Sequence, residues 1–489
     1  MKRKVFYIAV VILLLFTACS PRTQPTMIIP TTTSETFEPE NLDITPYPTR
    51  PSYAPGELVD YTAQTGDTLP GLAARFNTSI EEIRAANPNI PEDATTMPPG
   101  MPMQIPIYYR ALWGTPYQIL PDAAFVNGPD AIGFNPQTFI VQHQGWLGHY
   151  KAWAFDGTRT AGEIVSYVAI NYSISPKLLL ALLDYQGGGL SEPYLTEEDE
   201  ENVLGLESTY WVDVYLQLAY AANILNDGYY RWREGRLIEF ELSDGSIVRP
   251  DPWQNAATVA LQYFFSQALN TPGYYQAIGP DGFIHTYRIL FGDPGSIPAH
   301  IEGSLRQPEM ILPYKNDTSW MFTGGPHTGW GNMAPLAALD FAPPLEETGC
   351  YPSSEKVTAV ADGLVVRDGE GILVLDLDSD GHEQTGWVVF YLHIAEQERV
   401  PVGTQVKAGD PLGYPSCEGG KSTGTHIHIA RKYNGEWVVA DGVIPFILSG
   451  WEPLRGDEPY KGYLIKDDWV VVANTKPDNR SAIPCEGEE

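Results

Sequence analysis

The chain has 489 residues, which predicts two to four folded units at roughly 100–200 residues per domain. Its net charge of −31 argues against a nucleic-acid partner, because a polyanion would be repelled by this surface. Only 19% of the residues are charged, and 46 glycines and 42 prolines favour short strands, loops and linkers over coiled coil.

The N-terminus has the pattern of a secretory signal. Three basic residues precede an apolar run, Val5–Phe16, that ends shortly before Cys19. The run is shorter than the about 20 residues that a membrane-spanning helix needs. The placement of Cys19 resembles a bacterial lipoprotein processing site, which implies that residues 1–19 are a signal peptide and that Cys19 is lipidated. Residues 20–57 are rich in Thr and Pro and predict a disordered tether.

Residues 58–108 predict a small strand–helix–helix–strand module. A turn at Gly66-Asp67-Thr68 precedes the first helix, Ser79 caps the second, and Asn87-Pro88 ends it. The module resembles a LysM domain, which implies binding of polymers that contain N-acetylglucosamine, such as peptidoglycan, beside these two loops. The glycan-binding candidates are Gly66, Asp67, Thr68, Asn87 and Pro88. A purely structural βααβ unit is the alternative.

Residues 109–305 predict a mainly helical domain, with helical runs around 161–167, 175–185, 211–226 and 256–269. The run up to Gln186 is faintly similar to the helix that bears the catalytic acid of lytic transglycosylases. Those enzymes have Glu where this chain has Gln186, and an amide cannot donate a proton as a general acid. We therefore expect a packed helical spacer, or a degenerate lysozyme-like fold that still holds glycan.

Four histidines and one aspartate in the last third of the chain form a candidate metal site. His426 and His428 are two apart in a strand-like segment, so their side chains face the same way. His393 ends a second strong strand, His327 lies in a predicted Gly-rich loop over 324–330, and Asp340 follows on a short strand. Catalytic zinc sites use three nitrogen or oxygen ligands and keep one position open.

This pattern resembles the lysostaphin-type zinc endopeptidases, and most closely their β-lytic and staphylolysin branch. That branch has its first His thirteen residues before the Asp, as His327 and Asp340 are spaced here. The resemblance implies that His327, Asp340 and His428 bind zinc and that His393 and His426 form the catalytic pair. Which of the two is the general base stays open.

The same resemblance implies a disulfide between Cys350 and Cys417, with Cys485 outside it. Asp376-Leu377-Asp378-Ser379-Asp380-Gly381 has the start of a calcium loop, but Trp387 stands where an EF-hand needs Glu. A polar hairpin turn is therefore expected there, with bound calcium as the alternative. Tyr433 is a further candidate hydrogen-bond donor at the active site.

The predicted fold class is multidomain α+β. A LysM module and a helical domain precede an antiparallel β-rich peptidase domain over 306–455, with strands over 357–367, 372–377 and 387–393, and a C-terminal extension over 456–489. The predicted function is a zinc metalloendopeptidase that is lipid-anchored to the bacterial cell envelope and hydrolyses peptide stems or cross-bridges of peptidoglycan. The alternatives are a non-catalytic glycan-binding scaffold that activates another hydrolase, and glycan cleavage by the helical domain.

The Cys19 hypothesis predicts that cells supplied with a labelled fatty acid incorporate the label into this protein. The Cys19→Ala variant should carry no label, because the only thiol in the processing motif is gone. Label that survives this substitution would exclude lipidation at Cys19.

Overall fold

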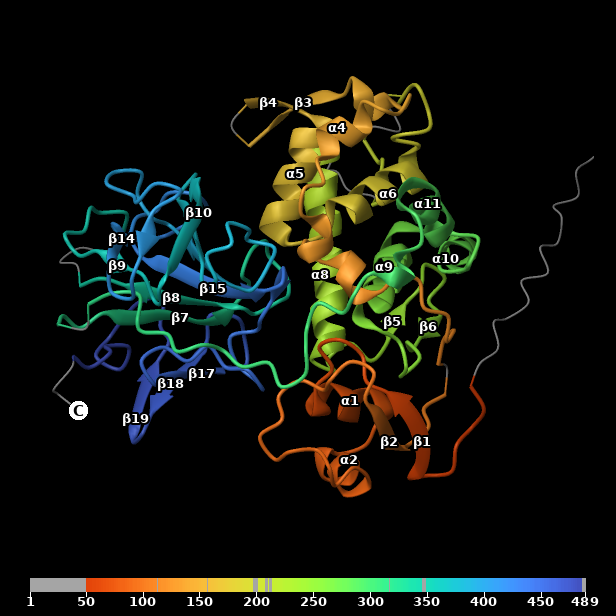
Figure 1. Ribbon diagram of the computed structural model, residues 1–489, viewed down its shortest axis with the longest axis horizontal. Coiled ribbons are helices and arrows are strands. Elements are labelled where there is room, and N and C mark those ends of the chain that lie inside the picture. The colour runs from red at the N-terminus through yellow and green to blue at the C-terminus, as the bar shows by residue number, and fades with distance from the viewer. Residues whose placement is uncertain are drawn as a thin grey trace, which may run out of the picture. The chain divides into compact units, whose positions relative to one another are not determined.

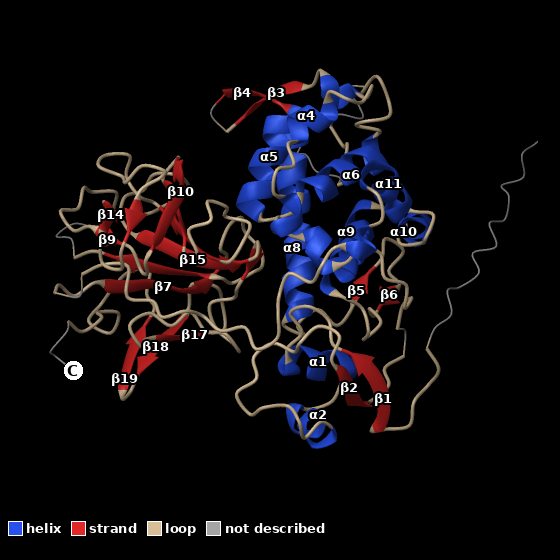
Figure 2. Ribbon diagram, viewed as in Figure 1, coloured by secondary structure: helices blue, strands red, loops and turns tan. Residues whose placement is uncertain are grey.

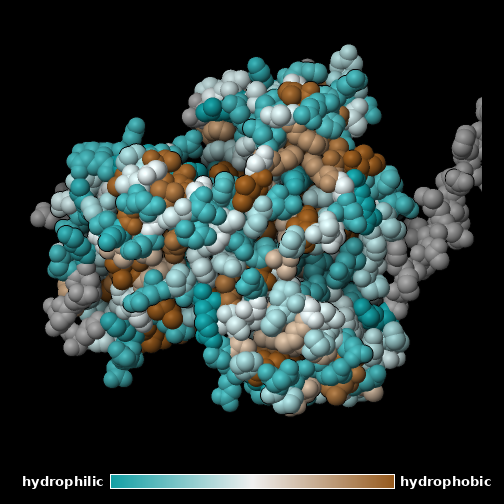
Figure 3. Space-filling model, in the orientation of Figure 1, coloured by the Kyte–Doolittle hydropathy of each residue, from teal (hydrophilic) through white to brown (hydrophobic). Residues whose placement is uncertain are grey.

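The computed structural model describes residues 50–111, 113–155, 157–196, 201–206, 210, 213–315, 317–344 and 349–485. Residues 47–489 belong to one unit. The predicted signal, Cys19 and most of the predicted tether lie outside the described residues. Within the described part, no helix has the length and apolar character needed to cross a membrane. Hydrophilic side chains cover much of the face drawn in Figure 3.

The LysM segment has the predicted βααβ order, and its elements are β1 (Glu57–Thr62), α1 (Leu69–Phe76), α2 (Ile80–Ala86) and β2 (Pro102–Ile107). The two strands pair antiparallel. The Thr68 hydroxyl accepts a hydrogen bond from the backbone N–H of Gly71 and caps α1, and Ser79 and Glu82 form a reciprocal capping box on α2. Leu72, Phe76 and Ile83 are fully buried between the helices and the hairpin.

The middle segment is mainly helical, as predicted (Figure 2). Its helices are α3 (Asp122–Phe125), α4 (Pro136–Ile140), α5 (Ala161–Tyr172), α6 (Pro176–Gly187), α8 (Val214–Arg233), α9 (Ala256–Ala268), α10 (Thr271–Ala277) and α11 (Phe283–Phe291), with short hairpins β3–β4 (Lys151–Ala154, Gly157–Thr160) and β5–β6 (Phe240–Glu241, Ile247–Val248). Helix α8 runs past the predicted end at Asn226, because its buried face continues through Tyr229, Tyr230 and Trp232. Gln186 lies on α6, where its amide donates to the carbonyl of Leu204.

The C-terminal segment is built on an eight-stranded antiparallel sheet in the order β13-β10-β11-β12-β15-β8-β7, with β16 paired to β15 (Figure 1). These strands are β7 (Met321–His327), β8 (Ala338–Ala342), β10 (Gly363–Gly369), β11 (Ile372–Asp376), β12 (Trp387–Leu392), β13 (Gln405–Val406), β15 (Ile427–Tyr433) and β16 (Glu436–Trp437). Beside it lie the pair β9 (Val357–Thr358) and β14 (Pro411–Gly413) and the three strands β17 (Glu452–Arg455), β18 (Gly462–Lys466) and β19 (Trp469–Val472).

The single strand predicted over 357–367 is two strands in the structure. The chain bends at residues 360–362, so β9 pairs with β14 while β10 joins the main sheet. The predicted strands over 372–377 and 387–393 correspond to β11 and β12, and they are antiparallel as expected.

The two faces of the main sheet are buried by different partners, because successive side chains of a strand point to opposite faces. On one face, Val374, Phe390 and Ala430 join the hydrophobic core of the helical segment. On the other face, Leu375, Val389 and Ile429 form the core of the β-rich segment. The sheet is therefore apolar on both sides, and the helical segment is part of its packing.

A buried ionic network joins the helical, β-rich and LysM segments around Arg233, the last residue of α8. Its Nη2 lies 3.0 Å from Asp122 Oδ2 and 3.1 Å from Glu436 Oε2, and Nη1 donates to the carbonyl of Thr65. Burial raises the pKa of a carboxyl, and here Arg233 and His300 overcome it and lower the pKa of Glu436 to about 2. Ionised Glu436 therefore stabilises the fold above its ordinary pKa, and this contribution is lost as the pH falls toward about 2.

We predict that Arg233→Met destabilises the protein by about 3–5 kcal/mol at neutral pH, because it removes the guanidinium that two buried carboxylates share. The thermal unfolding midpoint and urea denaturation measure the effect. Arg480→Met is the control, since Arg480 pairs with Asp478 at the surface and its loss should leave the midpoint unchanged. Equal midpoints for the two variants would contradict a stabilising role for the network.

Candidate metal centre

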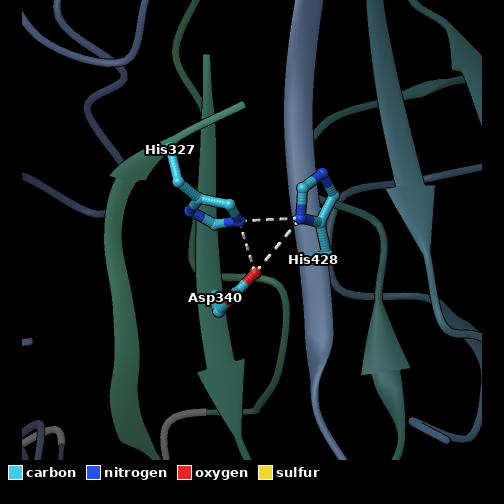
Figure 4. A group of neighbouring side chains, drawn as sticks. All are labelled: His327, Asp340 and His428. Carbon is cyan, nitrogen blue, oxygen red and sulfur yellow. Dashed lines mark hydrogen bonds and ion pairs between the residues drawn. The ribbon is translucent and has the colours of Figure 1, made fainter. Parts of the chain in front are cut away.

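The strand register brings three of the predicted ligands together (Figure 4). Asp340 on β8 is the direct cross-strand partner of His428 on β15. His327 is the last residue of β7, which pairs with β8 on its other side. The loop predicted over 324–330 is therefore wrong for 324–327, because Gly324 and Gly325 lie in the strand. Glycine is required there: a Cβ at Gly324 would lie 2.5 Å from Asp340 Oδ2.

The three side chains are buried and their ligand atoms are nearly equidistant. His327 Nε2 lies 2.9 Å from His428 Nδ1, and each of these atoms lies 3.2 Å from Asp340 Oδ1. A tetrahedral ion with bonds of about 2.0–2.1 Å separates its ligands by roughly 3.3 Å. The spacing of these three atoms therefore fits a small divalent metal such as zinc.

The hydrogen bonds on the far side of each ring identify the atoms that face the centre as acceptors. His327 Nδ1 lies 2.8 Å from the Gly325 carbonyl, and His428 Nε2 lies 3.0 Å from the Gly329 carbonyl. A carbonyl accepts only, so these nitrogens carry the protons and the inner nitrogens of the neutral rings present lone pairs. Asp340 Oδ1 is buried and has no hydrogen bond. Three converging acceptors repel one another unless a metal ion or an added proton lies between them.

The pKa shifts of Asp340 and His428 favour the protonation states that bind a metal ion. Burial opposes ionisation of Asp340, but the facing imidazoles of His327 and His426 hold the pKa of this carboxyl well below its usual range. Burial is also the main cause that lowers the pKa of His428. An ionised carboxylate and a neutral imidazole are the forms in which these groups bind metals.

The other two predicted histidines lie beside this cluster. His426 Nε2 is 3.8 Å from Asp340 Oδ1, and the rings of His393 and His426 are 4.5 Å apart between centroids. His393 Nδ1 lies 2.7 Å from the Glu418 carbonyl, and His426 Nδ1 lies 2.8 Å from the Gly424 carbonyl, so Nε2 is the acceptor atom of each neutral ring. Burial lowers the pKa of His393 to about 3, which keeps this ring neutral. Its φ of 72° lies in the sparsely populated left-handed region.

All five residues line one open cleft of about 810 Å³. The cleft wall includes the segment Lys421–Thr425, which follows Cys417. The structure joins Cys417 to Cys350 in a disulfide, the pairing that the resemblance implies. The Thr425 hydroxyl donates to the Tyr351 carbonyl next to that bridge. The disulfide and this hydrogen bond therefore attach the segment from Cys417 to Thr425 to residues 350 and 351.

Tyr460 is a residue at the site that the sequence did not indicate. Its ring stacks on His327 with centroids 4.0 Å apart and planes at 22°, and it lines the cleft. Gly325 N–H donates to the Tyr460 carbonyl, which attaches the C-terminal extension to the strand that carries His327. Tyr433, in contrast, is five residues beyond His428 on β15, so it faces the other side of the sheet and packs on Trp387.

The predicted glycan-binding side chains hold the LysM segment together. Asp67 is buried, accepts from the Tyr61 hydroxyl at 2.6 Å and pairs with Arg75. Asn87 donates to the carbonyls of Ile83 and Gln104 and so ties α2 to β2. The side chains of Asp67 and Asn87 are therefore engaged within the LysM segment itself.

The acidic turn at 376–381 connects β11 and β12 and is a polar hairpin turn, as expected. Asp376, Asp378 and Asp380 lie close enough to share an ion. However, Asp376 Oδ1 accepts the backbone N–H groups of Asp378 and Ser379, and Oδ2 accepts that of Gly381. The turn is therefore closed by its own hydrogen bonds, and calcium there stays a hypothesis.

Three family models match the chain. Residues 350–440 match the model described as Peptidase family M23, residues 61–106 match the LysM domain, and residues 118–302 match the model described as LasA, N-terminal domain. The M23 match includes His393, His426 and His428 and begins after His327 and Asp340.

Among curated proteins, Protease LasA of Pseudomonas aeruginosa strain UCBPP-PA14 is 27% identical over 343 residues, which cover 66% of this chain and 75% of that protein. Protease LasA of strain PAO1 is 26% identical over the same length. Among solved structures, the M23 metalloprotease pseudoalterin from the deep sea is 23% identical with a TM-score of 0.30, covering 35% of this chain and 98% of that one. The catalytic domain of lysostaphin from Staphylococcus simulans is 24% identical with a TM-score of 0.18, covering 26% and 90%.

The matches and the geometry agree on the kind of chemistry. The part of the β-rich segment that matches family M23 carries three of the five clustered residues, and the strands that precede it supply the other two. The chain thus carries a metallopeptidase domain of the lysostaphin type, matched by the Peptidase family M23 model, together with a LysM domain.

Proposed function

We propose that this peptidoglycan-targeting metallopeptidase is a zinc endopeptidase that hydrolyses peptide stems or cross-bridges of peptidoglycan. The observation that carries the proposal is the set of three buried acceptor atoms, 2.9–3.2 Å apart, in an open cleft with two further histidines. His327, Asp340 and His428 would hold the zinc. When bound, zinc polarises a carbonyl oxygen and lowers the pKa of a bound water toward about 7.

The residues of this chain can supply the proton transfers of amide hydrolysis. His393 and His426 each carry a proton on Nδ1, fixed by a backbone carbonyl, and each has Nε2 free to accept one. One ring can take a proton from the attacking water at Nε2 and return it to the leaving amine. The other ring, when it is protonated at Nε2 as well, can donate a hydrogen bond to the developing negative charge. The near-symmetry of the two rings leaves the assignment of the general base open.

The shape of the cleft supports a peptide substrate. Its walls include Met321 and Thr323 on one side and Ser422–Thr425 on the other, with Tyr460 beside the metal ligands. The peptidase segment would cut the peptide, and the LysM segment would bind the glycan strand to which such peptides are attached.

The proposed enzyme also has a lipid anchor at its N-terminus. A lipidated Cys19 followed by a tether would hold the enzyme at the bacterial cell envelope; both lie mainly outside the described residues.

The scaffold alternative is not favoured, since this chain retains all three ligand candidates and both further histidines. Gln186, whose amide is engaged with Leu204, gives no support to glycan cleavage by the helical segment.

We predict that the purified protein contains close to one zinc per chain by elemental analysis. Asp340→Ala should weaken zinc binding by more than about 10²-fold, because it removes the only anionic ligand of the three. Asp378→Ala is the control and should retain the metal, since Asp378 lies in the acidic turn. An equal zinc content in the two variants would exclude the proposed site.

A second prediction concerns activity on purified peptidoglycan. The protein should release new amino groups and no new reducing ends, and a chelator or His428→Ala should reduce the rate to background. His393→Ala should lower it by about 10²–10⁴-fold, the usual contribution of general acid–base catalysis. His382→Ala, at an exposed position just after the acidic turn, should have no effect. Hydrolysis that persists in His428→Ala with chelator would refute the mechanism.

A further inference from the structure

The LysM segment has two loops that meet at one surface: the β1–α1 loop, residues 63–68, and the α2–β2 loop, residues 87–101. Part of this surface is covered in the structure, where Thr96 and Gly66 are buried. The segment Ile301–Arg306, which connects the helical segment to the peptidase segment and is called here the linker, crosses both loops.

Two threonine hydroxyls hold the linker on these loops. In the β1–α1 loop, the Thr65 hydroxyl accepts from Ile301 N–H at 2.9 Å and donates to the Ile301 carbonyl at 3.1 Å. In the α2–β2 loop, the Thr96 hydroxyl accepts from Leu305 N–H at 3.0 Å and donates to the Glu302 carbonyl at 2.8 Å. Each hydroxyl thus satisfies both its donor and its acceptor on linker backbone.

Further contacts on the α2–β2 loop complete the docking. Ser304 N–H donates to the Thr96 carbonyl at 2.7 Å, and the Thr95 hydroxyl donates to the Leu305 carbonyl at 2.6 Å. The approach is close: a Cβ at Gly303 would lie 2.5 Å from Pro98 Cγ and 2.7 Å from its Cα. At the end of the linker, Arg306 pairs with Asp93.

The linker also makes an apolar contact with the peptidase segment. Ile301 and Leu305 are buried in one cluster with Val438 and Ile444, just beyond β16. A pocket of about 310 Å³ adjoins the linker, lined by Gly66, Thr68 and Thr96 of the LysM loops and by residues of the helical and peptidase segments. The space beside the LysM loops is therefore partly filled and covered from the peptidase side.

We propose that the linker is an intramolecular occupant of the glycan-binding groove of the LysM segment, so that a polymer of N-acetylglucosamine must displace it. The chemistry matches: the linker offers backbone N–H and C=O groups to Thr65 and Thr96, and the acetamido group of N-acetylglucosamine carries the same donor and acceptor. The inference deepens the proposed function and rests on its glycan binding. Only molecules in which the linker is released can bind glycan. The apparent affinity of the protein therefore equals the affinity of the released form multiplied by the fraction of molecules in that form.

Gly303→Val tests the competition, because its side chain would collide with Pro98 and displace the linker, and it substitutes no residue of either LysM loop. The matched control is Gly295→Val, where a Cβ meets no atom closer than 3.5 Å. The probe is the hexamer of N-acetylglucosamine, titrated calorimetrically into the full chain carrying Cys19→Ala. Gly303→Val should bind at least about tenfold more tightly than the control and the parent protein. Thermal unfolding verifies that each variant is folded.

Hydrogen exchange of the parent protein provides a second measurement that does not depend on a variant. Saturating hexamer should accelerate amide exchange at Ile301, Ser304 and Leu305, whose N–H groups are bonded to the LysM loops. Tight binding that is equal in all three proteins, with unchanged exchange in the linker, would overturn the occlusion and leave glycan binding intact. Absence of binding in all of them would instead overturn the glycan binding of the proposed function, and this inference with it.

Discussion

The structure of the site depends on one constraint, the mutual repulsion of three lone-pair acceptors that the sheet holds within 2.9–3.2 Å. No rearrangement of protons inside the cluster relieves it, because the outer nitrogens of both imidazoles are committed to the carbonyls of Gly325 and Gly329. A divalent cation is the group that turns this repulsion into attraction. The register that pairs Asp340 with His428 creates the constraint, and a slip by one residue would move one of them to the opposite face.

The sheet face that carries the site is shared. His428 points to the same face as Ala430, which packs into the core of the helical segment, while Ile427 and Ile429 belong to the core on the other side. The loop that follows His327 also contacts the helical segment, because Asn332 N–H donates to Asn223 on α8. The helical segment is thus a structural support of the peptidase sheet, which explains why a segment with little chemistry of its own is so extensively buried against it.

Charge and backbone bonds extend this coupling to the LysM segment. Arg233 joins a LysM loop carbonyl to carboxylates of the helical and β-rich segments, and the linker joins both LysM loops to the apolar cluster beyond β16. The LysM segment therefore shares buried contacts with the helical segment and, through the linker, with the β-rich segment.

The sequence by itself determined the local elements and the chemistry: the LysM capping box, the period-2 spacing of His426 and His428, and the thirteen-residue interval from His327 to Asp340 all depend on near neighbours in the chain. Tertiary structure alone decided the rest. It placed Tyr460 over His327, turned Tyr433 away, divided the strand predicted over 357–367, and laid the linker on the LysM loops. These features arise from contacts between residues tens to hundreds of positions apart, and no local pattern encodes which distant backbone group fills a given hydrogen bond.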